Sequence, residues 1–258
     1  MIIEITDISH EGLAPYFSLT EKELRREDLF IAESPNVIER GLNAGVRPVS
    51  FLCEASYAEK AWRLIGQSGD IPVFTGPGEL LASITGYKLS RGMLCAMERP
   101  QQPSVDSLLA KGNRVCVLYD ICDAVNVGAI FRTAAALGYD GILLSPTTCD
   151  PLNRRTVRVS MGAVFQIPWC YADGLPEILT RNDYRAISMA LSPNSVYLDE
   201  FKTDGSERYA IILGNEGFGL PKEIIDNSDA VVKIPISEGV DSLNVAAAAA
   251  IAMWQFRK

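Results

Sequence analysis

The chain has 258 residues, 48% of them hydrophobic, and a formal net charge of −8. This length and apolar content allow two domains, each with a buried core. The acidic balance argues against a protein that coats nucleic acid through a general basic surface, because phosphate binding needs concentrated lysine and arginine, but it leaves room for a local basic patch.

The first 27 residues are polar and mixed, and residues 18–24 resemble the capped start of a helix. Neither a basic leader nor an apolar run of membrane-spanning length is present, so we expect a cytoplasmic protein without a membrane partner. Strands and helices then alternate, which predicts a small α/β domain. The expected strands are 29–32, 49–53, 71–74 and 93–97, and the expected helices are 37–44, 58–66 and 77–84.

A segment rich in proline and glutamine, residues 98–104, is typical of a linker. We therefore predict an N-terminal α/β domain over residues 1–103 and a second α/β domain over residues 104–258. Strands as apolar as those of the second domain are typical of a mostly parallel sheet that is buried on both faces. The expected strands are 114–120, 141–144, 164–167, 184–189, 210–213 and 230–236, and the expected helices are 129–137, 175–180 and 245–255.

The strand 210–213 runs into a glycine-rich turn that contains Gly214, Gly217 and Gly219. This spacing is not the G-x-G-x-x-G fingerprint of dinucleotide-binding proteins, and the Gly-Lys-Ser/Thr of a phosphate-binding P-loop is missing. The glycines either form a tight strand-to-helix turn or let backbone N–H groups approach a ligand closely. The loop Ser242-Leu243-Asn244, before the alanine-rich last helix, is likewise either a helix cap or part of a site.

Two further motifs leave a structural and a functional interpretation open. Asn126 and Arg132 are compatible with a helix cap followed by a surface arginine, or with a pair of site residues. The basic segment with Arg154, Arg155 and Arg158 is either a solvated helix face or a patch that binds phosphates through charge and bidentate hydrogen bonds.

Cysteine and histidine usage excludes several classes of site. The six cysteines are scattered without a C-x-x-C pair, as reduced core thiols are, so we expect no zinc site and no other metal. His10 is the only histidine and lies far along the chain from every glycine-rich motif. Chemistry in the second domain therefore proceeds without an imidazole base, which argues against Ser-His-Asp and Cys-His hydrolases.

Taken together, the motifs are far more specific than any one of them. Asn126-x-Gly128-x-x-x-Arg132, then Ile212 to Leu220, then Ile234-Pro235-Ile236 and Ser242-Leu243-Asn244-Val245 follow the order and spacing of one family. From residue 114 onward the chain resembles a SpoU/TrmH-type RNA 2′-O-ribose methyltransferase of the SPOUT superfamily. Residues 29–97 more weakly resemble the ribosomal-protein-like domain that is often fused in front. The family often has proline where Ala124 stands and serine where Ala246 stands.

The resemblance implies a SPOUT-like α/β fold whose C-terminal stretch forms a trefoil knot, a homodimer, and S-adenosylmethionine as the methyl donor. It also implies the site residues. The catalytic group is Arg132, Asn126, Glu216, Ser242 and Asn244; the cofactor group is Leu213, Gly214, Gly217, Gly219, Ile234, Ile236 and Leu243; and Arg154, Arg155 and Arg158 would hold RNA phosphates.

The family's catalytic residue corresponds to Arg132. A free arginine is a very poor base, with a pKa above about 12, so we favour a role in gripping the phosphate beside the target ribose, with Glu216 as the alternative base. The expected partner is RNA and not DNA, with ribosomal RNA favoured over transfer RNA. Two rivals stay open: a non-catalytic RNA-binding protein that keeps the fold, and a nucleotide-dependent oxidoreductase, which the missing fingerprint disfavours.

Overall fold

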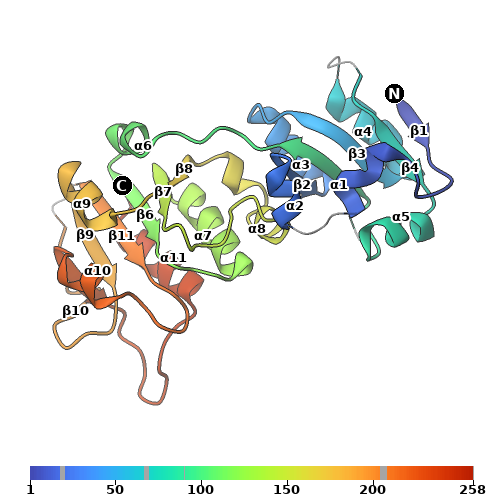
Figure 1. Ribbon diagram of the computed structural model, residues 1–258. Helices are drawn as coiled ribbons and strands as arrows, with labels where there is room; N and C mark the ends of the chain where they lie inside the picture. The colour runs from blue at the N-terminus through green and yellow to red at the C-terminus, as the bar shows by residue number, and fades with distance from the viewer. Residues whose placement is uncertain (18–20, 67–69, 90, 204–207, 258) are drawn as a thin grey trace. The chain divides into compact units, whose positions relative to one another are not determined.

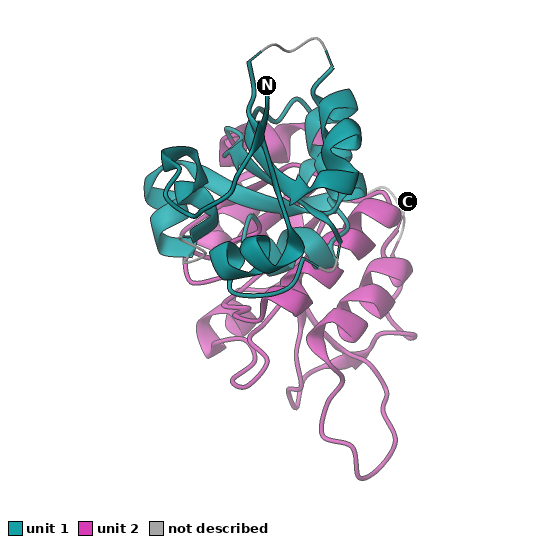
Figure 2. Cartoon of the chain, turned by 90° about the vertical axis from the view of Figure 1, so that its right-hand side faces the viewer, with its two compact units in different colours: residues 1–101, 152–165 teal, residues 102–151, 166–258 magenta. Residues whose placement is uncertain are grey.

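The computed structural model describes residues 1–17, 21–66, 70–89, 91–203 and 208–257. The chain divides into two units (Figure 2). Unit 1 is Met1–Gln101 with Leu152–Phe165, and unit 2 is Gln102–Pro151 with Gln166–Lys258. The segment Leu152–Phe165 thus groups with residues that precede the expected linker. The boundary that we expect at residue 103 stays a prediction.

Unit 1 is built on a five-stranded mixed sheet with the strand order β1-β4-β3-β5-β2. β1, β4 and β3 pair in parallel, whereas β5 runs antiparallel to both β3 and β2. The strands are β1 (Ile2–Glu4), β2 (Leu29–Glu33), β3 (Pro48–Glu54), β4 (Val73–Gly76) and β5 (Met93–Glu98). The helices are η1 (Glu11–Leu13), α1 (Ala14–Phe17), α2 (Glu21–Arg26), α3 (Pro35–Asn43), η2 (Ala55–Tyr57), α4 (Ala58–Ile65), α5 (Gly78–Thr85), α8 (Arg154–Val159) and η3 (Ala163–Phe165).

Unit 2 is built on a seven-stranded sheet in which every pair is parallel, with the strand order β10-β12-β9-β11-β6-β7-β8 (Figure 1). Its strands are β6 (Arg114–Leu118), β7 (Gly141–Leu144), β8 (Trp169–Tyr171), β9 (Tyr184–Met189), β10 (Val196–Tyr197), β11 (Arg208–Leu213) and β12 (Ala230–Lys233). Its helices are α6 (Val105–Lys111), α7 (Ala124–Ala136), α9 (Leu175–Arg181), α10 (Lys222–Asp226) and α11 (Val245–Gln255). The predicted α/β fold with a parallel sheet is confirmed.

The apolar runs of the central strands are explained by burial on both faces of this sheet. Val115 and Val117 of β6 share one core with apolar side chains of α6, α9 and α10. Cys116 and Leu118 alternate with them, are equally buried, and point to the opposite face. Helices α7 and α11 pack against each other (Figure 1). Because helices cover both faces of the sheet, only the ends of its strands can reach the surface. The connecting loops lie at those ends.

Three expectations about the elements are wrong in detail. Residues 164–167 are not a strand: Val164 and Phe165 belong to the 3-10 helix η3, where the Phe165 ring lies 5.7 Å from the Phe30 ring, and residues 166–167 form a turn and a bend. The helix expected at 129–137 begins earlier, at Ala124, and Asp123 is its cap, so Asn126 lies inside it. Strand β12 ends at Lys233 and leaves Ile234 and Ile236 in a loop. The expected cap at 18–20 lies outside the described residues.

Of the helices that the structure describes, none has the length and apolar character needed to cross a bilayer.

Candidate active site

A pocket of about 520 Å³ lies at the carboxyl ends of three neighbouring strands in unit 2. Met189 of β9, Leu213 of β11 and Lys233 of β12 mark those ends, and the loops that follow them form the walls. The loop before α11 closes the pocket. The carboxyl ends of parallel strands are where open α/β sheets bind their ligands.

The pocket collects residues that the sequence separates widely. Every residue of the predicted cofactor group lines it, as do three residues of the predicted catalytic group. These are Leu213, Gly214, Gly217, Gly219, Ile234, Ile236 and Leu243 of the first group and Glu216, Ser242 and Asn244 of the second. Aliphatic side chains and glycine backbone therefore form one part of the wall, and short polar side chains form another.

The glycine turn between β11 and α10 owes its shape to Gly214 and Asn215. A Cβ added at Gly214 would lie 2.5 Å from the carbonyl carbon of Gly219 and 2.6 Å from the backbone nitrogen of Leu220, so only glycine fits. The backbones of Asn215 and Gly219 exchange two hydrogen bonds of 3.1 and 2.9 Å. Gly219 has a φ of +70°, which favours glycine. The turn is therefore a tight loop in which the backbone itself borders the pocket.

Asn215, to which the sequence analysis assigned no role, closes the glycine turn. Its Oδ1 accepts hydrogen bonds from the N–H groups of Gly217 (2.8 Å) and Phe218 (3.0 Å), and its Nδ2 donates to the carbonyl oxygen of Asp120 (2.7 Å). An asparagine followed two residues later by glycine is a known signal for such a side-chain-closed turn. Asn215 thereby ties the glycine turn to the end of the β6 segment.

Three polar residues, from helix α7, the glycine turn and the loop before α11, form one hydrogen-bonded chain at the rim of the pocket. Asn244 Nδ2 donates to Asn126 Oδ1 over 3.0 Å, and Asn126 Nδ2 donates to Glu216 Oε1 over 2.9 Å. Asn126 is only 8% exposed, which requires that its amide be satisfied. The same Glu216 oxygen accepts a longer bond of 3.4 Å from the N–H of Asp123. The other carboxylate oxygen, Oε2, accepts no hydrogen bond from the described residues.

Helix caps fix two members of this chain in place. Asn244 is the N-cap of α11, since its Oδ1 accepts hydrogen bonds from the N–H groups of Ala246 and Ala247. Asp123 caps α7 through a bond from the N–H of Val125, and this sets the helical phase of Asn126. The helix-cap interpretation of Asn244 is therefore correct, and its role as a site residue stays a prediction.

Arg132 is not brought to this cluster. It follows Asn126 by six positions on α7, which places it about 120° around the helix axis at 3.6 residues per turn. Its side chain is exposed and makes no hydrogen bond or ion pair with the residues that the structure describes. Ser242 lies in the pocket wall, also without a side-chain hydrogen bond to the described part of the chain.

Cys122 shares the rim with this cluster. Partial desolvation, together with the carboxylates of Asp120 and Glu216, raises the pKa of the Cys122 thiol. A thiol in this environment stays protonated near neutral pH and is a poor nucleophile. The geometry therefore offers hydrogen-bond acceptors and an apolar wall, and no activated thiol.

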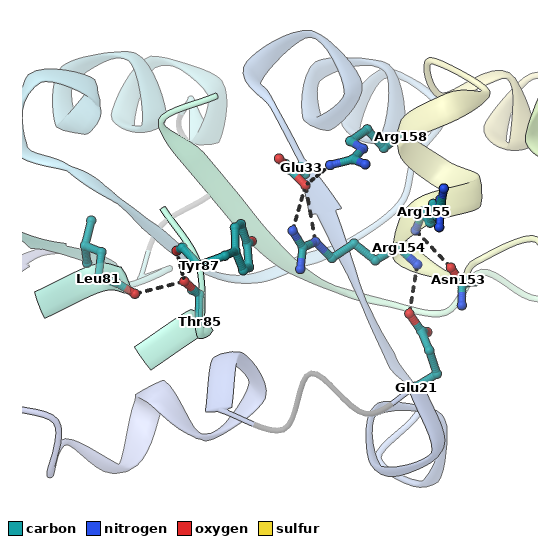
Figure 3. Close-up of polar contacts among 9 residues, drawn as sticks. All are labelled: Glu21, Glu33, Leu81, Thr85, Tyr87, Asn153, Arg154, Arg155 and Arg158. Carbon is teal, nitrogen blue, oxygen red and sulfur yellow. Dashed lines mark hydrogen bonds and ion pairs between the residues drawn. The ribbon is translucent and has the colours of Figure 1, made fainter. Parts of the chain in front are cut away.

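The basic segment lies in unit 1, where α8 packs against β2 (Figure 3). Arg154 donates to Glu33 Oε2 through Nε (3.2 Å) and Nη2 (2.9 Å), and Arg158 Nη1 lies 3.5 Å from the same oxygen. Glu33 is 1% exposed. The Arg154 guanidinium also lies 4.2 Å from the centre of the Tyr87 ring, and burial raises the pKa of Tyr87 to about 12.

The three arginines of this segment are therefore not equivalent. Arg154 and Arg158 share their charge with one buried carboxylate, whereas the Arg155 side chain is exposed and forms no ion pair with the described residues (Figure 3). Their predicted contact with RNA phosphates stays a prediction. Of the three, Arg155 is the one whose charge is left for a ligand.

Comparisons with known proteins point to one family. A model described as the SpoU rRNA Methylase family matches residues 113–254. A protein of Mycobacterium tuberculosis named as an uncharacterized tRNA/rRNA methyltransferase is 37% identical over 88% of this chain and 80% of its own length. The 23S rRNA (guanosine(2553)-2′-O)-methyltransferase RlmP of Bacillus subtilis is 31% identical over 70% of this chain and 76% of its own length.

The fold agrees as well. A crystal structure of an AdoMet-bound rRNA methyltransferase from Sinorhizobium meliloti superimposes with a TM-score of 0.85 over 99% of this chain and 97% of that chain, at 26% identity. All the residues that line the pocket, and Asn126 with Arg132, fall within the stretch that the family model matches.

Proposed function

The chain belongs to the SpoU rRNA Methylase family, and from this premise we propose that it methylates a ribose 2′-hydroxyl of ribosomal RNA. It is an RNA methyltransferase that uses S-adenosylmethionine, as the family and the AdoMet-bound relative indicate. The ribose hydroxyl as the target is supported by the 2′-O-methyltransferase RlmP, and ribosomal RNA by RlmP and the Sinorhizobium enzyme. A ribosomal RNA substrate implies that the chain works in the cytoplasm.

The pocket suits the proposed cofactor in size and in lining. Its volume of about 520 Å³ is in the range of small-molecule sites, roughly 300–1,000 Å³. Gly214 lets the backbone of Gly219 and Leu220 pack directly against it, so the turn borders the pocket with backbone atoms. In our proposal Leu213, Gly214, Ile234, Ile236 and Leu243 hold the cofactor, while Gly217 and Gly219 keep the turn tight.

When bound, S-adenosylmethionine would supply an electrophilic methyl group: a bond from the ribose oxygen to the methyl carbon would form as the S–CH3 bond breaks, leaving a neutral thioether, and the hydroxyl would lose its proton. The task of the chain is to orient that oxygen and to receive or stabilise the proton. The chain Asn244–Asn126–Glu216 holds one carboxylate oxygen of Glu216 and leaves Oε2 for the substrate hydroxyl. Ser242, in the same wall, is placed to donate to a ribose oxygen.

Arg132 enters the proposal as the group that grips the phosphate beside the target ribose and polarises its hydroxyl. Arginine keeps its charge at any working pH and binds phosphate in a bidentate manner, so this role suits it better than that of a base. Because Arg132 and the Glu216 cluster lie on different sides of α7, we propose that Arg132 of a second copy completes each site. The working form is then a homodimer.

We also propose a trefoil knot in the C-terminal stretch and a contact between unit 1 and RNA. The loops after β11 and β12 and the loop before α11 line one pocket, as expected if residues 209–254 are threaded as a trefoil knot. Unit 1, with the exposed Arg155 on α8, supplies a contact to RNA outside the site. Such phosphate contacts position the substrate without reading its sequence.

The observation that carries this proposal is the hydrogen-bonded chain Asn244–Asn126–Glu216 beside a pocket that only glycine at position 214 permits. The test is a map of 2′-O-methyl sites in total RNA from a strain that lacks the chain and from its parent. We expect one ribosomal RNA nucleotide to lose its 2′-O-methyl group in the deletion strain. A site in transfer RNA would redirect the substrate, and identical maps would favour a non-catalytic protein that keeps the fold.

A further inference from the structure

Phe218, at the tip of the glycine turn, is exposed in a way that its surroundings do not explain. It is 94% exposed, the highest value among the large apolar side chains that the structure describes. It also lines the pocket, two residues after Glu216. A phenylalanine ring carries a large apolar surface, and its exposure in the lining of the pocket, rather than elsewhere on the surface, makes it a candidate contact for a ligand.

The turn holds the ring outward. The N–H of Phe218 donates to Asn215 Oδ1 over 3.0 Å, and the backbones of Asn215 and Gly219 close the loop with two hydrogen bonds. The neighbours on both sides, Gly217 and Gly219, have no side chains that could cover the ring. The backbone that carries Phe218 is therefore fixed, and both faces of its ring are open to a flat partner.

The proposed substrate brings such a partner to this place. The base of a nucleotide is bonded to C1′, the sugar carbon next to the C2′ that bears the hydroxyl. If Glu216 receives the hydroxyl, the base of the same nucleotide lies within reach of the side chain two residues further on. Unpaired RNA bases are held by stacking on aromatic side chains, and stacking accepts any base.

We propose that Phe218 is a stacking platform for the base of the methylated nucleotide, an inference that rests on the proposed ribose methylation. It positions the nucleotide in the site and does not discriminate among bases. Because the base stacks on the π face of the ring, only another aromatic side chain can replace Phe218 in this role.

The test compares Phe218→Ala, Phe218→Leu and Phe218→Trp in the full chain, with RNA from the deletion strain as the probe. Base stacking on an aromatic ring contributes about 1–3 kcal/mol, so kcat/KM for RNA is expected to fall about 5- to 150-fold in the Ala and Leu variants. Phe218→Trp should retain activity. Affinity for S-adenosylmethionine, measured by calorimetry, should not change in any of them. Val196→Ala, at an exposed apolar position outside the pocket, is the control.

Phe218→Leu separates stacking from apolar packing, because leucine keeps the bulk and loses the π face. Full activity of Phe218→Leu would overturn the inference, and so would a loss that follows weaker cofactor binding or a change of oligomeric state in light scattering. RNA retention on filters is measured in parallel and reports the stacking contribution without turnover. If the wild type modifies no ribose, the proposed reaction fails; if it modifies a ribose and Phe218→Ala does so at the same rate, only the stacking inference fails.

Discussion

Gly214 is the residue at which the pocket is least tolerant of change. The atoms that an added Cβ would meet are the backbone of Gly219 and Leu220, which cannot rotate away as a side chain end can. Those backbone groups belong to the turn that Asn215 closes. Any substitution must therefore open the turn and alter the wall of the pocket.

We expect Gly214→Ala to weaken S-adenosylmethionine binding at least tenfold, about 1.4 kcal/mol, and to destabilise the fold by roughly 1–3 kcal/mol through overpacking. Calorimetric titration and urea denaturation measure the two effects. Gly217→Ala is the comparison within the same turn and should weaken binding far less, because a Cβ there meets only Asn215 Oδ1, at an ordinary contact distance of 3.5 Å. Equal cofactor affinity in the Gly214 variant and wild type would argue that the cofactor binds elsewhere.

At the scale of elements, ion pairs between arginines of α8 and a glutamate of β2 hold the two elements together. Glu33 is buried and its Oε2 takes three contacts from Arg154 and Arg158. Its other oxygen, Oε1, has no hydrogen-bond partner among the described residues. A buried carboxylate with so few partners depends strongly on its arginines.

Arg154→Ala should therefore lower the free energy of unfolding by about 3 kcal/mol, because it removes the closest charge from a buried carboxylate. Arg155→Ala should change stability by less than about 0.5 kcal/mol, as exposed substitutions do, and should weaken RNA binding instead. Urea denaturation and filter binding give both readouts for both variants. If the two variants destabilise equally, the ion pair with Glu33 does not hold α8.

The elements also show where sequence reasoning succeeds. The strands of unit 2 were predictable because burial on both faces makes them continuously apolar. Residues 164–167 have a similar composition, yet Val164 and Phe165 form part of a 3-10 helix in unit 1, where Phe165 packs against Phe30. Arg154 and Glu33 are 121 residues apart in the sequence, and neither has a neighbouring sequence motif that predicts their contact. The spacing of apolar residues in the sequence indicates that a segment is buried. It does not indicate which part of the chain the segment packs against.

In the candidate site, too, the sequence predicts local features better than contacts between distant segments. The glycine turn and the residues around Asn244 were predictable because their backbone needs specific residues in sequence. For Asn126 the helix-cap interpretation is wrong, because Asp123 caps α7, and its assignment to the site stays a prediction. The exposure of Phe218 and the separation of Arg132 from Glu216 follow from helix phase and turn geometry in three dimensions. These two features lead to the proposals that sequence reasoning alone did not make.

At the scale of the whole molecule, the separation of Arg132 from the Glu216 cluster predicts sites that two copies share. α11 exposes Ile251 and Trp254, large apolar side chains that a second copy would cover. Arg132→Ala alone should abolish methylation and leave cofactor affinity unchanged, because Arg132 lies outside the pocket wall. Gly214→Ala alone should lose cofactor affinity while its Arg132 stays intact.

Mixing these two variants, at a cofactor concentration too low to occupy the Gly214→Ala pocket, tests the shared site. In a mixed dimer, the pocket of the Arg132→Ala copy receives Arg132 from the Gly214→Ala copy, so one intact site forms. After exchange of subunits we expect up to about a quarter of wild-type activity, since half of the dimers are mixed and each has one working site of two. No activity in the mixture, with mixed dimers verified by differential tagging, would mean that Arg132 acts within its own copy.

The most direct test of the central claim, ribose methylation, uses the purified chain. It is incubated with ribosomal RNA from the deletion strain and S-adenosylmethionine that carries an isotopically labelled methyl group, and the digested nucleosides are identified by mass spectrometry. The structure predicts label in one 2′-O-methylnucleoside, on the sugar fragment. Label on a base, or no label in RNA while the cofactor binds, would contradict it.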